Sequence, residues 1–225
     1  MHEPPVVVSV VVPVYNGERL IARCMESLLA QSDVTVDVIV VDDGSTDRSI
    51  EVASSFPVRV VARPHAGVSA ARNAGLRVAR AALIGFCDHD DEWLPTKAAR
   101  QISYLDQHPE VASVLCRQEI VLPPGVDPPS WLQPDEQGDI GGPLPMSGLF
   151  RAEALAAVGG FDEELAGNED LDLLVRMREL GYQSAVLDDR LVVRHVHDDN
   201  WSHGPGSYVP GLFEVLRRRA HRSRT

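Results

Sequence analysis

Four apolar, β-branched runs recur early in this chain, separated by segments with helical spacing. The runs cover 6–12, 36–41, 58–61 and 83–87, and helices are expected at 18–31, 47–55 and 69–81. Strands joined by helices in this way form parallel sheets through right-handed crossovers. In such sheets ligands bind beyond the carboxyl ends of the strands. The alternation therefore predicts an α/β fold whose chemistry gathers at one edge of the sheet.

Acidic residues follow the fourth run at an unusual density. Asp88, Asp90, Asp91 and Glu92 place four acids within five positions. Such a cluster is costly unless a cation neutralises it, and hard oxygen ligands suit Mg²⁺ or Mn²⁺ that bridge to the phosphates of a substrate. A solvated acidic loop is the alternative, but the preceding strand favours a site.

The second half of the chain is less regular. Helices are expected at 96–106 and 170–180, strands at 111–116 and 184–193, and a strand running into a helix at 147–158. The segment 121–145 holds seven prolines and shows no periodicity. Long loops of this kind are usually functional or mobile. We find no repeat and no linker, and expect one domain over 1–225 with two functional halves, 6–93 and 94–205, and a C-terminal helix or basic tail (206–225).

Composition narrows the class of protein. The 225 residues are 44% hydrophobic and 24% charged, which is typical of a globular protein, and a net charge of −12 argues against nucleic-acid binding. The basic end, 217–225, is either a solvated tail or a peripheral contact with anionic lipid or a charged acceptor. Three scattered cysteines indicate neither zinc nor disulfides. The run 6–14 is too short to span a membrane, so a cytoplasmic protein is expected.

Six motifs together resemble the family 2 glycosyltransferases of the GT-A fold. They lie at 10–17, 40–47, 67–75, 88–93, 158–163 and 169–173, and the resemblance extends from Val8 to about Ser202. Each motif alone is weak evidence for the family, but six motifs in this order and spacing are strong evidence. The resemblance implies a single GT-A domain with a Rossmann-like, mixed, mainly parallel sheet flanked by helices.

The family transfers a sugar, with inversion, from a nucleotide-sugar to an acceptor. The resemblance thus implies that 6–93 is a nucleotide-sugar-binding half and 94–205 an acceptor-binding half. The resemblance therefore implies a donor that is a UDP-sugar in most members, and a glycan, lipid-linked or small-molecule acceptor. It also implies Mn²⁺ or Mg²⁺, which stabilises the departing diphosphate. By resemblance Asp90 coordinates the metal directly, and Asp88 faces the ribose or a metal-bound water. His89, where the family usually has a small residue, is a solvated side chain or a ligand.

The same resemblance assigns the nucleotide site. Asp43 is expected to accept the imide N–H of the base, with Asp42 as its rival; either could instead cap the helix after Ser45. Pro13 and Tyr15 would form the wall beside the base, although Tyr15 could belong to the core. The adjacent pair Arg72 and Asn73 would reach the nucleotide or its diphosphate, unless Arg72 forms a structural salt bridge.

The catalytic base is also assigned by resemblance. An inverting transfer needs a group that deprotonates the acceptor hydroxyl, and Asp170 matches the family's base position. Glu169 would lie at the acceptor site or hold Asp170 in place. The alternative for both is that acids at the start of a helix favour its dipole. His197 fits the position of a family histidine that completes the metal site in some members, and His195 shares its face of the expected strand.

The sequence departs from the family pattern in two places. His65 stands where many members have Asn, and Trp131, within the unmatched segment 121–145, could stack on a sugar or pack in its loop.

Other functions compete with that of a transferase. A nucleotidyltransferase would carry a basic, glycine-rich loop after its first strand, which this chain lacks. A non-catalytic binding protein of the same fold would be indicated by loss of Asp90 or Asp170, and both are present. A Rossmann dehydrogenase is disfavoured because no GxGxxG motif follows the first strand.

Overall fold

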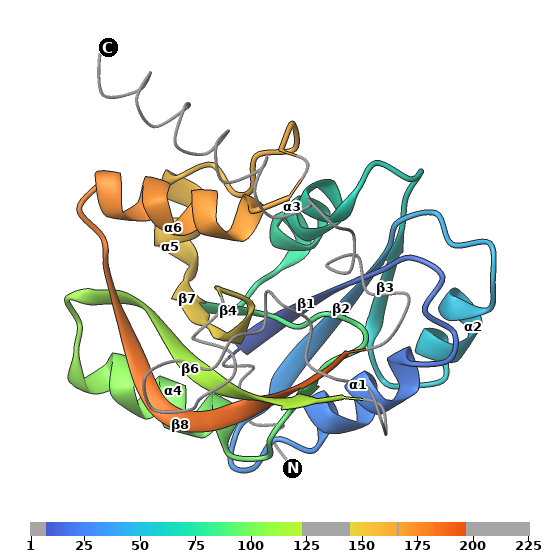
Figure 1. The fold of residues 1–225 in the computed structure, drawn as a ribbon, viewed down its shortest axis with the longest axis horizontal. Coiled ribbons are helices and arrows are strands. Elements are labelled where there is room, and N and C mark those ends of the chain that lie inside the picture. The colour runs from blue at the N-terminus through green and yellow to red at the C-terminus, as the bar shows by residue number, and fades with distance from the viewer. Residues whose placement is uncertain (1–7, 123–144, 166, 197–225) are drawn as a thin grey trace.

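The structure, a computed structural model of the 225-residue chain, is described for residues 8–122, 145–165 and 167–196. One eight-stranded mixed sheet runs through it in the order β3-β2-β1-β4-β7-β6-β8-β5, with helices on both faces (Figure 1). The expected α/β class with a mixed sheet is confirmed.

The first half of the sheet is wholly parallel. β1 pairs with β2 and β4, and β2 pairs with β3, so the predicted strands lie side by side with their carboxyl ends at one edge. Their bounds are β1 Val8–Val14, β2 Val36–Asp42, β3 Arg59–Ala62 and β4 Leu83–Phe86. β1 is buried along its full length, as a β-branched strand covered on both faces should be.

The second half mixes directions. β7 (Leu149–Arg151) lies antiparallel between β4 and β6 (Val111–Val121), and β8 (Gln183–His195) runs parallel to β6. β5 is only Glu92–Trp93 and pairs antiparallel with β8. The sequence did not predict β5, because two residues are too few to show a period. Its consequence is large, since it ties the acidic loop to the far edge of the sheet.

Two helical layers cover the sheet, and each has its own apolar core (Figure 1). One layer holds α1, α2 and α4, and the other holds α3, α5 and α6. Alternation along β1 divides the strand between them: Val10 and Val12 face the first layer and Val11 faces the second. The helices are α1 Ile21–Leu29, α2 Ser49–Ser54, α3 Val68–Val78, α4 Lys97–Gln107, α5 Ala152–Ala157 and α6 Glu169–Glu179, and one 3₁₀ turn covers Pro145–Ser147.

The second helix begins two residues later than expected, at Ser49, whose backbone N–H donates to Asp47 Oδ1. Ser45 Oγ accepts the backbone N–H of Asn16, and the N–H of Thr46 donates to Asn16 Oδ1. The polar residues after β2 therefore tie the loops after β1 and β2 together.

α3 approaches the sheet closely through Gly75. A Cβ there would lie 2.3 Å from Val11 Cγ1, so any side chain would push the helix off β1. Residues 69–75 are all buried, including Arg72 and Asn73. The helix therefore delivers polar side chains to the interior on more than one of its faces.

A buried cation lies beneath the junction of the two halves. Lys97, at the start of α4, has no exposed surface; its Nζ donates to Gln101 Oε1 at 2.7 Å and lies 3.6 Å from the centre of the Trp93 ring. Burial lowers the pKa of Lys97 to about 8. Gln101 in turn donates to the carbonyls of Val114 and Ser147, so this polar group is integrated into the core.

Within the described ranges, every helix is too short or too polar to cross a bilayer.

Candidate active site

A cleft of about 1140 Å³ opens at the carboxyl ends of the parallel strands. The first half contributes the loops after β1, β2 and β4 together with the start of α3, and the second half contributes β8, the 3₁₀ turn and the start of α6. The predicted residues that line it are Pro13, Tyr15, Asp43, Arg72, Asp88, Asp90, Glu169 and Asp170. Two predicted site residues within the described ranges, Asp42 and Asn73, do not line the cleft.

The acidic loop after β4 carries closely coupled carboxylates. Burial, together with Asp90 and Asp88, raises the pKa of Asp91 well above its usual value. Burial alone would also raise the pKa of Asp88, but the guanidinium of Arg72 reverses this and lowers it. Arg194 of β8 lowers the pKa of Asp88 further and partly offsets the rise in the pKa of Asp91. Two arginines thus moderate a cluster that would otherwise repel itself.

Arg72 joins the two acidic groups of the cleft. Its Nη2 donates to Asp88 Oδ1 at 2.9 Å and its Nη1 donates to Glu169 Oε1 at 2.6 Å. The residue is 3% exposed, and its guanidinium lies 5.4 Å from the centre of the Phe161 ring. Burial would lower its pKa, but Asp88, Glu169 and Asp170 outweigh that effect and raise it. The predicted structural salt bridge is therefore present, and it is double.

Asp170 lies in the first turn of α6, behind a left-handed residue. Asn168 has φ 56° and reverses the chain immediately before the helix. Asp170 Oδ1 accepts the N–H of Leu171 at 2.7 Å. Burial and the neighbouring Glu169 raise the pKa of Asp170, while Arg72 opposes them. A carboxylate with a raised pKa that faces a cleft is a stronger base than one in water.

Asp43 organises the loop that precedes α3. Its carboxylate accepts the backbone N–H groups of Ala66 at 3.1 Å and Gly67 at 2.7 Å, and the side chain is 4% exposed. Asp42 accepts the N–H groups of Gly44 and Ser45 and is 1% exposed. Neither carboxylate caps α2, so that alternative is wrong for both, and of the two only Asp43 reaches the cleft.

Tyr15 lies at the mouth of the cleft and is 47% exposed. Its ring packs against His65 in a tilted arrangement, with ring centres 4.4 Å apart and 34° between the ring planes. The alternative that Tyr15 belongs to the core is therefore wrong. His65 Nδ1 lies 2.9 Å from Asp43 Oδ2, which connects this aromatic pair to the buried carboxylate. The arrangement offers an aromatic surface with a carboxylate beneath it.

Asn73 points away from the cleft. Its Nδ2 donates to the carbonyl of Phe161 and to Glu163 Oε1, and its Oδ1 accepts the N–H of Phe161. A Cβ on Gly160 would lie 2.5 Å from Asn73 Oδ1, so the fit is close. The structure therefore places Asn73 as the anchor of the segment before α6, rather than beside Arg72 in the cleft.

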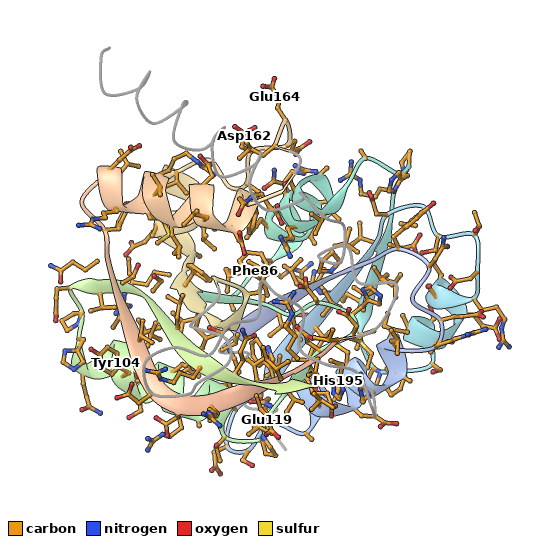
Figure 2. The ribbon with its side chains drawn as sticks, viewed as in Figure 1. Phe86, Tyr104, Glu119, Asp162, Glu164 and His195 are labelled. Carbon is orange, nitrogen blue, oxygen red and sulfur yellow. The ribbon has the colours of Figure 1, made fainter. Side chains whose placement is uncertain are left out.

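The histidines lie in different environments. His89 lines the cleft and packs on Gly17, where a Cβ would lie 2.4 Å from the imidazole ring, so it is more than a solvated side chain. His195, at the end of β8 (Figure 2), has its Nε2 2.6 Å from Glu92 Oε1, and Arg23 also contacts that carboxylate. His197 lies outside the described residues, as does Trp131.

Two cleft residues, Val192 and Arg194, lie outside the six motifs. Val192 faces Trp93 across β5 and β8, and Arg194 follows on the same face of β8. The signal in the sequence was the alternation of the last strand, whose register could not be known without β5. These residues add apolar surface and a cation to the wall of the cleft.

The donor set fits a small divalent cation. Asp88 and Asp90 both face the cleft, and Mg²⁺ is usually bound by one or two carboxylates plus substrate phosphates. Within the described residues no three His, Cys, Asp or Glu side chains form a closed metal cage. An open site of two carboxylates, completed by substrate oxygens, is consistent with both observations.

Comparisons with known proteins agree with this geometry. The family model for glycosyl transferase family 2 matches residues 9–152. Two similar curated proteins are the uncharacterized glycosyltransferase EpsJ of Bacillus subtilis (strain 168), 43% identical over 37% of this chain, and the chondroitin synthase of Pasteurella multocida (strain Pm70), 28% identical over 90% of it. The chain spans 26% of the first and 22% of the second.

Solved structures share the fold at low identity. Staphylococcus aureus TarS 1–349 in complex with UDP-GlcNAc superposes with a TM-score of 0.75 and 22% identity, covering 94% of this chain and 64% of that one. The mannosyltransferase PcManGT of Pyrobaculum calidifontis, in complex with GDP-Man and Mn²⁺, gives 0.72 and 20%, covering 95% and 64%. These neighbours are GT-A glycosyltransferases, as the sequence motifs predicted.

Proposed function

Because this chain belongs to glycosyl transferase family 2, we propose that it transfers a sugar from a nucleoside-diphosphate sugar to an acceptor hydroxyl, with inversion at the anomeric carbon. The observation that carries the proposal is that one cleft holds both the acids of the loop after β4 and the acids that open α6. The first group suits a diphosphate and its cation, and the second suits a base on the acceptor side.

The donor lies over the carboxyl ends of β1, β2 and β4 in this proposal. The base rests beside Tyr15 and Pro13 with Asp43 beneath, and Asp90 and Asp88 are the residues that would hold Mn²⁺ or Mg²⁺. The cation, when bound, neutralises charge that develops on the leaving diphosphate. We propose a UDP-sugar as donor; among similar structures, one holds UDP-GlcNAc and another holds GDP-Man with Mn²⁺.

The transfer step follows from the position of Asp170. Its carboxylate takes the proton of the acceptor hydroxyl while that oxygen attacks the anomeric carbon. The bond from the anomeric carbon to the phosphate oxygen breaks on the opposite side of the sugar, and the nucleoside diphosphate leaves with the bonding electrons. The raised pKa of Asp170 favours this proton transfer. The acceptor is a glycan, a lipid-linked intermediate or a small molecule that passes Trp93 and Arg194.

Calorimetric titration tests the donor class first. Uridine, guanosine and deoxythymidine diphosphates are each added with Mn²⁺ and with EDTA. We expect one of them to bind, and to bind more weakly in EDTA because the charge of the two acids is then uncompensated. A folded protein that binds none of the three contradicts the proposal.

Product formation separates the enzyme from a non-catalytic binding protein. The donor selected by titration is incubated with pooled acceptors, and release of the nucleoside diphosphate is measured. Release that depends on both the acceptor and Asp170 supports transfer. Tight donor binding with no release from any acceptor favours the non-catalytic alternative.

A further inference from the structure

The double ion pair of Arg72 spans the two functional halves of the cleft. Arg72 comes from α3, Asp88 from the loop after β4, and Glu169 from the start of α6, 97 positions further along the chain than Arg72. The bonds are 2.6 and 2.9 Å long, and such charge-assisted pairs are stronger than neutral hydrogen bonds. One side chain therefore connects the donor acids with the base segment.

The guanidinium binds one carboxylate through each of its two terminal nitrogens. These bonds use two of its five N–H groups, and Nε is buried with no hydrogen-bond partner among the described residues. The position of Arg72 between acids from the two halves indicates that it links them.

Resting on the proposed function, we propose that Arg72 is a positioning residue that couples donor binding to placement of the catalytic base. Asp88 and Glu169 share it as their common counter-ion. When the donor and its cation bind Asp88, the guanidinium pairs with Glu169 alone. This pair then fixes the first turn of α6, which contains Asp170. Donor binding then prepares the acceptor side before the acceptor arrives.

The coupling must work in both directions, because linkage between two sites is reciprocal. When Glu169 loses its charge, the buried guanidinium has Asp88 as its remaining ion-pair partner and holds it more firmly. The donor must then compete for Asp88, and its affinity falls, although Glu169 itself lies on the acceptor side. Without Arg72 the same change at Glu169 has no route to the donor site.

A double-mutant cycle measures this coupling through nucleotide affinity alone. The four proteins are the unaltered chain, Glu169→Gln, Arg72→Met and the double variant, each titrated with the selected nucleoside diphosphate and Mn²⁺. We expect Glu169→Gln to weaken binding about five- to tenfold in the unaltered background and less than about twofold in the Arg72→Met background. Glu163→Gln is the matched control, since this nearby exposed acid binds Asn73 instead of Arg72.

If Arg72→Met fails to fold, Arg72→Lys replaces it in the cycle. A lysine keeps the charge but lacks the planar fork that spans two carboxylates, so the effect of Glu169→Gln should shrink in this background too. Hydrogen exchange gives a second measurement without any acceptor. The nucleotide should slow exchange at the amides of Leu171 to Leu173 in the unaltered chain and leave them unchanged in Arg72→Lys.

The outcomes separate the two proposals. Equal loss of affinity for Glu169→Gln in both backgrounds means that Glu169 meets the nucleotide directly, and it overturns the coupling while the transferase proposal stands. A similar loss for Glu163→Gln also overturns it. If the unaltered, folded chain binds no nucleoside diphosphate, the proposed function fails and the coupling fails with it.

Discussion

The two halves of the molecule contribute opposite sides of one cleft but position their functional side chains differently. In the parallel half, Asp42 and Asp43 are held by backbone N–H groups of nearby loops. In the second half, Glu169 is held by Arg72 of the other half, and the pKa of the neighbouring Asp170 is raised by burial and by Glu169 and lowered by Arg72. The first half is thus locally organised, and the second depends on contacts that only the complete fold provides.

The largest effect is expected on the acceptor side. Asp170→Asn should lower turnover by about 10²–10⁴-fold, because it removes the base, while nucleotide affinity stays within about twofold. Initial rates and calorimetry on the same preparation check this. Glu164→Gln, at the outer edge of the molecule (Figure 2), is the control and should keep full turnover. A parallel loss of nucleotide affinity in Asp170→Asn would break the division between the halves.

The junction between the halves should respond to pH through Lys97. Its pKa falls from 10.5 to about 8 on folding, so between these values the unfolded chain binds one more proton than the folded chain. Stability therefore rises as pH increases from 8 to 10.5, by about 3 kcal/mol. Lys97→Met should lack this rise, and urea denaturation of both proteins at several pH values measures the difference. Parallel curves would contradict the burial of a charged ammonium.

A substitution in the acidic loop after β4 should change the affinity for the nucleotide. Asp90→Ala should weaken the affinity for the nucleoside diphosphate in Mn²⁺ by about 10-fold or more, because a carboxylate ligand is lost. In EDTA the variant and the unaltered chain should bind alike, which is the internal control. Equal weakening with and without the metal would assign Asp90 a direct contact with the nucleotide.

A last comparison separates two neighbours on α3, Arg72 and Asn73. Asn73→Ala should lower the free energy of unfolding by about 1–3 kcal/mol, because the buried N–H and C=O of Phe161 lose their partner. Nucleotide affinity should stay unchanged, in contrast to changes at Arg72. Thermal denaturation and calorimetry test both statements, and weaker nucleotide binding would return Asn73 to the cleft.

The same contrast explains what the sequence could predict. The strands and helices of the parallel half follow from period and composition, and their order places the acids after β2 and β4 at one edge. The choice between Asp42 and Asp43, or between Arg72 and Asn73, depends on which way one side chain points on a known element. No periodicity encodes that, because residues 72 and 73 are both buried.

The second half was harder for a different reason. β8 was expected and found, but its cleft-facing residues depend on its pairing with the two-residue β5 and on the shifts in its register with β6. Arg194 therefore had no predictable partner. The double pair of Arg72 has the same origin, since its two acids are 16 and 97 positions away.

The contact between His89 and Gly17 has an evolutionary consequence. A Cβ at position 17 would need the space that the imidazole fills, at 2.4 Å from its ring, so the two positions share one volume. Val14 Cγ2 would lie 2.7 Å from the same Cβ, so a side chain at 17 needs both a smaller residue at 89 and a shift of Val14. We therefore expect a bulky residue at 89 to restrict position 17 to glycine, so that the two residues together set the shape of this wall of the cleft.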